Sequence, residues 1–365
     1  MADGPILDPI AWTRASFKSA ADFTIALTDA DREELRAAVV ALERGARPGQ
    51  IEMHAREQYQ FPKLCPKLER AYDEVRAGRG FVVLRGIPTG GFTLDRFISA
   101  VWGFGTYFGR ALSQNAQGET IGHVVDASQE DPTPRMYRSA QELGLHSDIT
   151  AMLALACWHK SATGGVNVLT SGVTVHNEFK RRAPELLAPL YRGFHYHRMG
   201  EEGPDETPIT PHRIPVFAEV DGEISCRYQR IGIASGEHGL GHALSDTDLA
   251  ALNLFDEIAR APENRVAFKL ERGDMLVLNN YAIMHARTRF TNPPEAALKR
   301  HLIRLWLDGN SDFRKVPPTF YHFATNGVPP QPGRGCTYDF KKLYQEAPLL
   351  TGGMVDMKVA DSEIV

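Results

Sequence analysis

The sequence predicts a mainly β fold with helical insertions, in which short strands form a sandwich or barrel core. Helical patterns fill the N-terminal part, and short apolar segments separated by turn residues dominate the remainder. No G-x-G-x-x-G follows a strand, and no G-x-x-x-x-G-K-[ST] occurs, which weakens nucleotide-binding folds. A chain of 365 residues with 43% hydrophobic content can bury a large core within one domain.

The N-terminal part reads as three helices and one strand. Residues 31–44 have helical apolar spacing with acidic residues in the first turn. Residues 66–77 and 93–108 also read as helices. Between them, the β-branched run 81–84 is bounded by glycines and Pro88, which predicts a buried strand.

The middle of the chain predicts two strands, a helix and a long loop. Residues 149–158 and 166–170 are apolar segments joined by a Gly-Gly turn. Residues 174–192 look helical, with Pro184 as a break or a new start. Residues 200–213 hold three prolines and four acids, typical of an exposed loop that acts as a lid or a linker.

The last third is β-like around one helix. Asp221-Gly222 joins segments 214–220 and 223–228 as a hairpin. Ser245 with Asp248 opens a helix over 246–261 in the manner of a capping box. Further strands are predicted at 266–270, 275–283 and 300–307, before a Pro- and Gly-rich tail.

Charge and cysteine usage restrict the partners and the compartment. The net charge of −4 gives no basic excess for nucleic acid. The cysteines at 65, 157, 226 and 336 are widely spread, which suits a reducing compartment. No signal peptide or apolar membrane span is indicated, so we expect a cytoplasmic protein without nucleic-acid or membrane partners.

The most informative segment is Gly144-Leu145-His146-Ser147-Asp148. On a strand, residues i and i+2 face the same side, so His146 and Asp148 would point together into one cavity. With a second histidine they make the two-His-one-carboxylate set that binds Fe(II) and leaves positions open. Alone, H-x-D is weak, since 13 histidines make chance matches common and the pair can simply hydrogen-bond.

His285 ends an apolar strand 137 residues after Asp148 and is the candidate third ligand. A histidine at a strand end is common on its own. A ligand so distant along the chain has to be brought back by a closed β architecture, such as a jelly roll. His195 and His197 also have i, i+2 spacing, but no carboxylate accompanies them, and we expect a solvated or core pair.

A third signal lies in the strand Arg300-His301-Leu302-Ile303-Arg304-Leu305-Trp306. Arg300 and Arg304 share a face with Trp306, while His301 faces the other way. Buried arginines are costly without anions, and the guanidinium fork suits carboxylates. The alternative is a solvated face, or arginines paired to protein carboxylates.

Together these segments resemble the taurine dioxygenase-like branch of the Fe(II)/2-oxoglutarate-dependent dioxygenases. Gln114–Gly118, Gly164-Gly165 and Asn279-Asn280-Tyr281 are also similar to segments of that branch, over about residues 78–310. The resemblance implies a double-stranded β-helix core at 78–310. Residues 1–77 would be a helical elaboration and 311–365 a C-terminal wrap of the same catalytic domain.

The resemblance also implies the chemistry and the roles of the residues. His146, Asp148 and His285 would be the Fe(II) ligands, and 2-oxoglutarate and O2 the cosubstrates. Arg300 would pair with the distal carboxylate of 2-oxoglutarate. Asn167 stands where the family commonly has Thr or Ser on the cosubstrate, and this departure leaves an ordinary turn role open. Asp148, where halogenases have a small residue, indicates oxygen chemistry.

For the substrate, Arg304, Asn115, Tyr228 and Arg230 are candidate contacts, with structural roles as the alternative for each. The predicted activity is oxidation of a small anionic metabolite, such as an amino acid or a sulfonate, by hydroxylation, desaturation or cyclisation. A zinc hydrolase-like enzyme and a silent jelly-roll binding protein are the alternatives. The sequence leaves the oligomeric state open.

Overall fold

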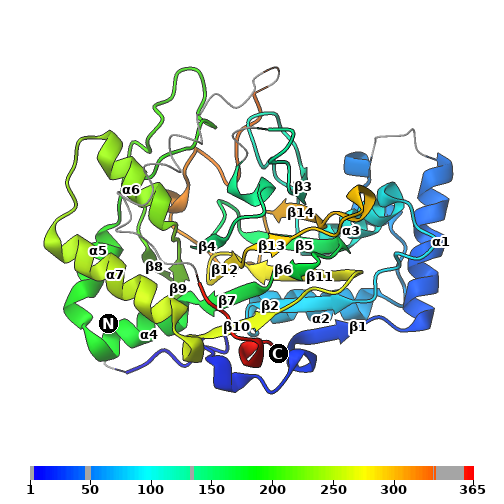
Figure 1. Cartoon of the computed structure of the whole chain (residues 1–365), viewed down its shortest axis with the longest axis horizontal. Helices are drawn as coiled ribbons and strands as arrows, with labels where there is room; N and C mark the ends of the chain where they lie inside the picture. The colour runs from blue at the N-terminus through cyan, green and yellow to red at the C-terminus, as the bar shows by residue number, and fades with distance from the viewer. Residues whose placement is uncertain (1–3, 46–50, 132–134, 332, 334–356) are drawn as a thin grey trace.

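The computed structural model describes residues 4–45, 51–131, 135–331, 333 and 357–365. Two sheets form the centre of the molecule, and helices lie on both sides of them (Figure 1). The strands pair antiparallel, apart from one parallel N-terminal pair. The predicted mainly β jelly roll with helical insertions is confirmed.

The major sheet has six strands in the order β1-β2-β11-β5-β14-β3. Their bounds are β1 Thr24–Ala26, β2 Phe81–Arg85, β11 Asp274–Asn279, β5 Met152–His159, β14 His301–Leu307 and β3 Ile121–Val125. The minor sheet has four strands in the order β10-β7-β12-β4. These are β10 Arg265–Phe268, β7 Asn167–Ser171, β12 Ile283–Arg287 and β4 Leu143–His146. Small pairs are formed by β6 Thr163–Gly164 with β13 Phe290–Thr291, and by β8 Phe217–Val220 with β9 Glu223–Cys226.

From β3 onward, the chain passes repeatedly from one sheet to the other, although β7 and β10 both belong to the minor sheet. β4, β7, β10 and β12 belong to the minor sheet, whereas β5, β11 and β14 belong to the major sheet. This alternation is what returns residues far apart in sequence to one space between the sheets. Leu153, Leu276 and Leu302 of the major sheet point into that space, and their neighbours Ala154, Val277 and Ile303 pack toward the helices.

Helices cover the outer faces of both sheets. α1 Asp29–Gly45, α2 Cys65–Arg76 and α3 Leu94–Phe108 lie on the side of the major sheet. α4 Gly172–Arg182, α5 Leu187–Arg192, α6 Arg230–Gly239 and α7 Asp246–Arg260 form the insertion on the side of the minor sheet. Because both faces of the central strands are covered, β11 is buried along its whole length.

The strand predicted at 275–283 is two strands. β11 ends at Asn279, Asn280–Ala282 turn the chain, and β12 begins at Ile283 in the other sheet. The Ala282 N–H donates to the Asn279 carbonyl over 3.1 Å. The polar pair Asn279-Asn280 stands at this corner, but both side chains are fully buried, and the apolar residues on either side make the segment read as one strand.

Helix α6 was not predicted. Its sequence contains three glycines, which have low helix propensity. Packing explains them, because a Cβ on Gly236 would lie 2.2 Å from the His195 carbonyl oxygen. The helix therefore forms where another backbone segment needs to approach it closely. The helices that were predicted are present. The hairpin at Asp221-Gly222 and the capping box of Ser245 and Asp248 are present as well.

The described end of the chain lies on the minor sheet. Ile364 forms a β-bridge with Ala267 of β10, and Arg265 of the same strand forms an ion pair with Glu363 at 2.6 Å.

Cys65, Cys157 and Cys226 are free, and Cys336 lies outside the described residues. The division at residues 77 and 310 stays a prediction. Among the described helices, none has the length and apolar character needed to cross a membrane.

Candidate active site

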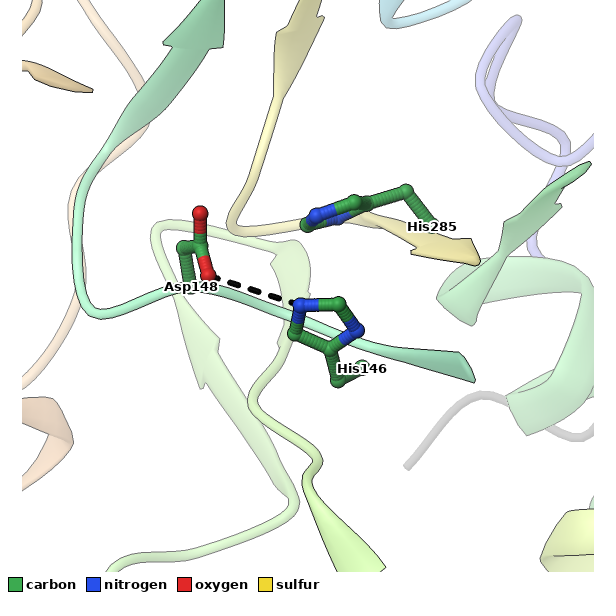
Figure 2. A group of neighbouring side chains, drawn as sticks. All are labelled: His146, Asp148 and His285. Atoms are coloured by element: carbon green, nitrogen blue, oxygen red, sulfur yellow. Dashed lines mark ion pairs between the residues drawn. The ribbon is translucent and has the colours of Figure 1, made fainter. Parts of the chain in front are cut away.

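His146, Asp148 and His285 converge in the space between the sheets (Figure 2). His146 ends β4 and pairs in register with His285 of β12, and Asp148 lies two residues past the end of β4. One ligand atom from each lies within 4.8 Å of the other two, in the sole group of this kind among the described residues. The strand pairing thus supplies the third ligand that spacing alone could not place.

The hydrogen bonds of the three side chains leave donor atoms available for a cation. His146 donates its Nδ1–H to the Gly144 carbonyl at 2.8 Å, which leaves Nε2 facing Asp148 Oδ1 at 3.5 Å. Asp148 Oδ2 accepts a hydrogen bond from Trp306 Nε1 at 2.8 Å. In His285, Nδ1 is buried with no hydrogen-bond partner among the described residues. This donor set fits a divalent metal ion of the Fe(II) type.

Burial and charge favour the protonation states that bind metal. Burial lowers the pKa of His285 to about 3, so its imidazole is neutral. Burial alone would raise the pKa of Asp148, but the contact with His146 and the positive charge of Arg304 hold it well below its usual range. A neutral histidine and an ionised carboxylate are the forms that coordinate a cation.

The main chain of Asp148 is held by two buried side chains. Asn280 accepts the Asp148 N–H at 3.0 Å and donates its Nδ2 to the carbonyls of Asp148 and Thr150. Arg227 donates to the same Asp148 carbonyl. Because Asp148 lies beyond the end of its strand, these contacts take the place of the ladder that would otherwise fix it.

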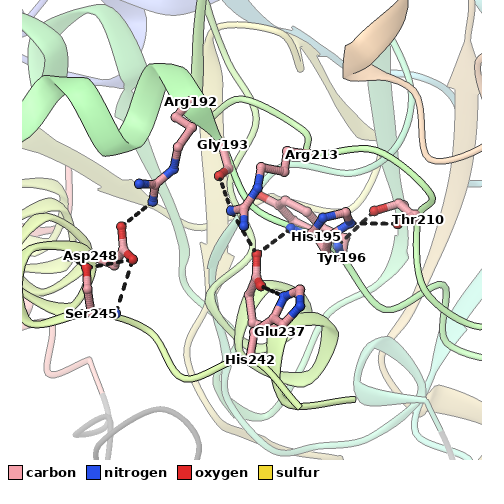
Figure 3. A network of polar contacts seen from close by, with 10 residues as sticks. All are labelled: Arg192, Gly193, His195, Tyr196, Thr210, Arg213, Glu237, His242, Ser245 and Asp248. Carbon is pink, nitrogen blue, oxygen red and sulfur yellow. Dashed lines mark hydrogen bonds and ion pairs between the residues drawn. The ribbon is translucent and has the colours of Figure 1, made fainter. Parts of the chain in front are cut away.

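The ligands open onto a cavity of about 210 Å³. The inner faces of both sheets line it, together with segments that precede β4 or follow α5. Hydrogen bonds to Glu237 of α6, which is 2% exposed, hold the segment that follows α5 in place. Figure 3 shows the contacts: the His195 N–H donates to Glu237 over 2.9 Å, and Arg213 and His242 reach the same carboxylate.

The model of the family described as "Taurine catabolism dioxygenase TauD, TfdA family" matches residues 45–306. The chain belongs to this family. The predicted enzyme class, a dioxygenase dependent on Fe(II), 2-oxoglutarate and O2, is thereby confirmed. The FR-33289 synthase of Streptomyces rubellomurinus is 30% identical over 311 residues, which are 83% of this chain and 90% of that protein. The taurine hydroxylase-like protein SAT17 of Stachybotrys chartarum is 28% identical over 330 residues, or 86% and 83% of the two chains.

Solved structures agree with the jelly roll at low sequence identity. An asparagine oxygenase in complex with Fe(II), 3-hydroxyasparagine and succinate has a TM-score of 0.61 at 16% identity, covering 78% of this chain and 93% of that one. The non-heme iron oxygenase OrfP, in complex with Fe and alpha-ketoglutaric acid, has a TM-score of 0.59 at 12% identity, covering 79% and 94%.

Three other residues suggested by the dioxygenase resemblance lie at the cavity. Arg304 is buried on the inner face of β14, Arg300 is buried directly before that strand, and Asn167 lies on β7 of the opposite sheet. Asn167 Nδ2 reaches the Phe268 carbonyl at 3.4 Å. His301 points away and contacts His123 at 2.9 Å, as the strand alternation predicts.

The structure does not bring Tyr228, Arg230 or Asn115 to the cavity. Tyr228 donates to Asp256 at 2.8 Å, and Arg230 donates to Asn253 at 2.8 Å. Asn115 bonds Glu119 within its own turn. For each of the three, the position next to it faces the cavity instead, as Arg227, Gln229, Ile231 and Gln114 show.

Sequence reasoning also missed Arg287, which lies on β12 two residues after His285 and lines the cavity. The i, i+2 rule that linked His146 to Asp148 would have found it. His197, of the alternative histidine pair, lines the cavity, while His195 donates its Nδ1–H to the Thr210 carbonyl at 2.8 Å. Neither belongs to a metal group in the described part of the chain.

Proposed function

We propose that His146, Asp148 and His285 hold Fe(II), and that the cavity beside them binds 2-oxoglutarate and a small anionic substrate. The observation that carries this proposal is the convergence of the three ligand atoms within 4.8 Å at the floor of a cavity with buried arginines. When bound, Fe(II) supplies the redox chemistry that couples oxidative decarboxylation of 2-oxoglutarate to oxidation of the substrate. The protein residues orient both organic molecules and exclude water.

Arg300 is the proposed anchor of the distal carboxylate of 2-oxoglutarate. It is 4% exposed, and burial lowers the pKa of its guanidinium to about 10. Its Nη1 has no hydrogen-bond partner among the described residues. A buried cation of this kind is costly until an anion joins it, and the planar guanidinium suits a carboxylate. Asn167, across the cavity, is the proposed amide contact to the same molecule.

Arg304 is the proposed anchor of an anionic group on the substrate. Its Nε donates to Gln114 at 2.6 Å, and its Nη1 lies 3.7 Å from Asp148 Oδ2. The second contact is longer than a hydrogen bond. Because a bound metal ion would neutralise much of the negative charge of Asp148, Arg304 would then lack a full counter-ion. The guanidinium therefore favours a carboxylate or sulfonate placed beside the metal.

An amino acid is the first substrate class to test. The asparagine oxygenase and OrfP structures hold hydroxylated amino acids, and an amino acid carries the carboxylate that Arg304 would bind. The zinc hydrolase alternative gives no role to the buried Arg300.

The experiment is a screen for substrate-stimulated succinate formation with Fe(II), ascorbate and 2-oxoglutarate. Amino acids and sulfonates are compared with their amides and with uncharged analogues of equal size. We expect stimulation by an anionic compound and none by its neutral analogue. Equal stimulation by both members of a pair would contradict the anionic-substrate assignment.

A further inference from the structure

Arg287 lies at the cosubstrate end of the cavity without an assigned role. It is 5% exposed, on the cavity face of β12 that also carries His285. It pairs in register with Asn167 of β7, the proposed amide contact to 2-oxoglutarate. Two neighbours of Arg287 on this face, His285 and Asn167, therefore belong to the proposed metal and cosubstrate site, and the third, Leu143 of β4, is apolar.

The protein contacts of Arg287 are neutral. Its Nη2 donates to the carbonyls of Ser139, at 2.8 Å, and Gln141. Its Nε is buried with no hydrogen-bond partner among the described residues. A purely structural tie between β12 and the segment before β4 uses the Nη2 atom and leaves both the charge and Nε unexplained.

Arg287 and Arg300 share one aromatic neighbour. The guanidinium carbons of the two lie 4.8 Å and 4.9 Å from the centre of the Phe290 ring. No ion pair joins either arginine to an acidic side chain among the described residues, although the charges of Asp126 and Glu142 act on Arg287 from farther away. Burial, and then the charge of Arg300, lower the pKa of Arg287 to about 9. The cavity thus holds two like charges at one end, an arrangement that an incoming anion would stabilise.

We propose that Arg287 is a specificity-determining residue that, with Arg300, selects a 2-oxo acid bearing a second carboxylate. This inference rests on the proposed function, in which Arg300 anchors the distal carboxylate. The metal end of the cosubstrate is the same in any 2-oxo acid, so discrimination has to come from the far end. Two cations there penalise a 2-oxo acid with an uncharged tail, because it would leave both of them buried without an anion.

The test compares 2-oxoglutarate with 2-oxopentanoate, which has the same five carbons and lacks the distal carboxylate. Dissociation constants are measured by anaerobic calorimetry on the Fe(II)-loaded protein, without turnover. The variants are Arg287→Gln, Arg287→Lys, Arg300→Gln and the double variant. Arg289→Gln is the matched control, because Arg289 is exposed and lies outside the cavity.

We expect Arg287→Gln to raise the Kd of 2-oxoglutarate by about tenfold or more, which is about 1.4 kcal/mol of binding free energy. The Kd of 2-oxopentanoate should change much less, and Arg289→Gln should change neither. Arg287→Lys should lie between wild type and Gln, because it keeps the charge and loses the fork. In the double variant the loss should be smaller than the product of the single losses, because the two arginines share one carboxylate.

Equal weakening of both 2-oxo acids by Arg287→Gln would mean that Arg287 only supports the fold of the site, and would overturn the inference. An unchanged 2-oxoglutarate Kd in Arg287→Gln, with a large rise in Arg300→Gln, would overturn it while leaving the proposed function intact. No effect of Arg300→Gln would instead refute the anchor in the proposed function. If Arg287→Gln does not fold, the Lys variant decides, because an unchanged ratio of the two Kd values contradicts the inference.

Discussion

Trp306 donates its indole Nε1–H to Asp148 Oδ2 across 2.8 Å, and so gives the two oxygens of that carboxylate different roles. Oδ2 is occupied by the indole, while Oδ1 faces His146 Nε2 at 3.5 Å. Such contacts behind a metal ligand fix its orientation and commonly tune metal affinity. β14, which carries Arg304 and Trp306, therefore also positions the carboxylate of the proposed ligand Asp148.

Replacing Trp306 by Phe should weaken Fe(II) binding roughly 10- to 100-fold, since the carboxylate loses its positioning donor. Anaerobic metal titration of the purified protein measures this. Trp102→Phe is the control, because Trp102 also donates a buried indole bond, to the His54 carbonyl at 3.0 Å, but lies in α3. Equal metal affinity in the two variants would show that Trp306 does not position Asp148.

Asn280→Ala should lower both stability and metal affinity. Asn280 is fully buried and bonds the main chain of Asp148 and Thr150, so its removal leaves buried polar groups unpaired at a cost of about 1–3 kcal/mol. Urea unfolding and metal titration measure the two effects. Asn264→Ala, which loses a buried bond to the Ile258 carbonyl, should lower stability alone. An Asn280 variant with native metal affinity would argue against a positioning role.

Arg304→Ala should weaken binding of the substrate much more than binding of 2-oxoglutarate. The reason is that Arg300, not Arg304, is the proposed partner of the distal carboxylate, while Arg304 lies beside Asp148. Anaerobic titration of both ligands into the variant, using the substrate found by the screen, separates the two affinities. Equal losses, or a loss only for 2-oxoglutarate, would remove the substrate-anchor role.

His176 should make the stability of the metal-free protein depend on pH. Burial lowers the pKa of His176 to about 4, from 6.5 in the unfolded chain. The unfolded state therefore binds the proton more readily, and the contribution is complete above pH 6.5 and lost as the pH falls toward 4. At about 1.4 kcal/mol for each pKa unit, its size is roughly 3 kcal/mol.

His176→Gln does not titrate and can keep the bond to the Tyr191 hydroxyl, which is 2.8 Å from His176 Nε2. Urea unfolding between pH 7 and pH 4 should show a shallower loss of stability in this variant than in wild type. The exposed His238→Gln serves as the control. Parallel curves for wild type and His176→Gln would contradict the prediction.

Part of the candidate site could be predicted because its signals are local in the sequence. His146 with Asp148, and Arg300 with Arg304, are each read from positions two or four apart. The pairing of His285 with His146 could not be derived from spacing, since it depends on how the chain alternates between the sheets. It entered through the resemblance, and the strand register supplies its physical cause.

The errors also have physical causes. Tyr228 and Arg230 were candidate contacts with a structural role as the alternative, and they lie outside the cavity that their neighbours Arg227 and Gln229 line. A shift of one residue reverses every side chain, and nothing within that segment sets its orientation. Helix α6 was missed because close backbone packing, rather than helix propensity, requires its glycines.

The most direct test of the account is succinate formation from 2-oxoglutarate by the wild-type protein and by His285→Ala, each with Fe(II) and ascorbate. His285 is the proposed ligand that the strand pairing, rather than a local motif, brings to the site. We expect Fe(II)-dependent succinate release from the wild type, loss on chelation of the metal, and no release above background from the folded variant. Near-native succinate release from His285→Ala would contradict the assignment of the metal centre.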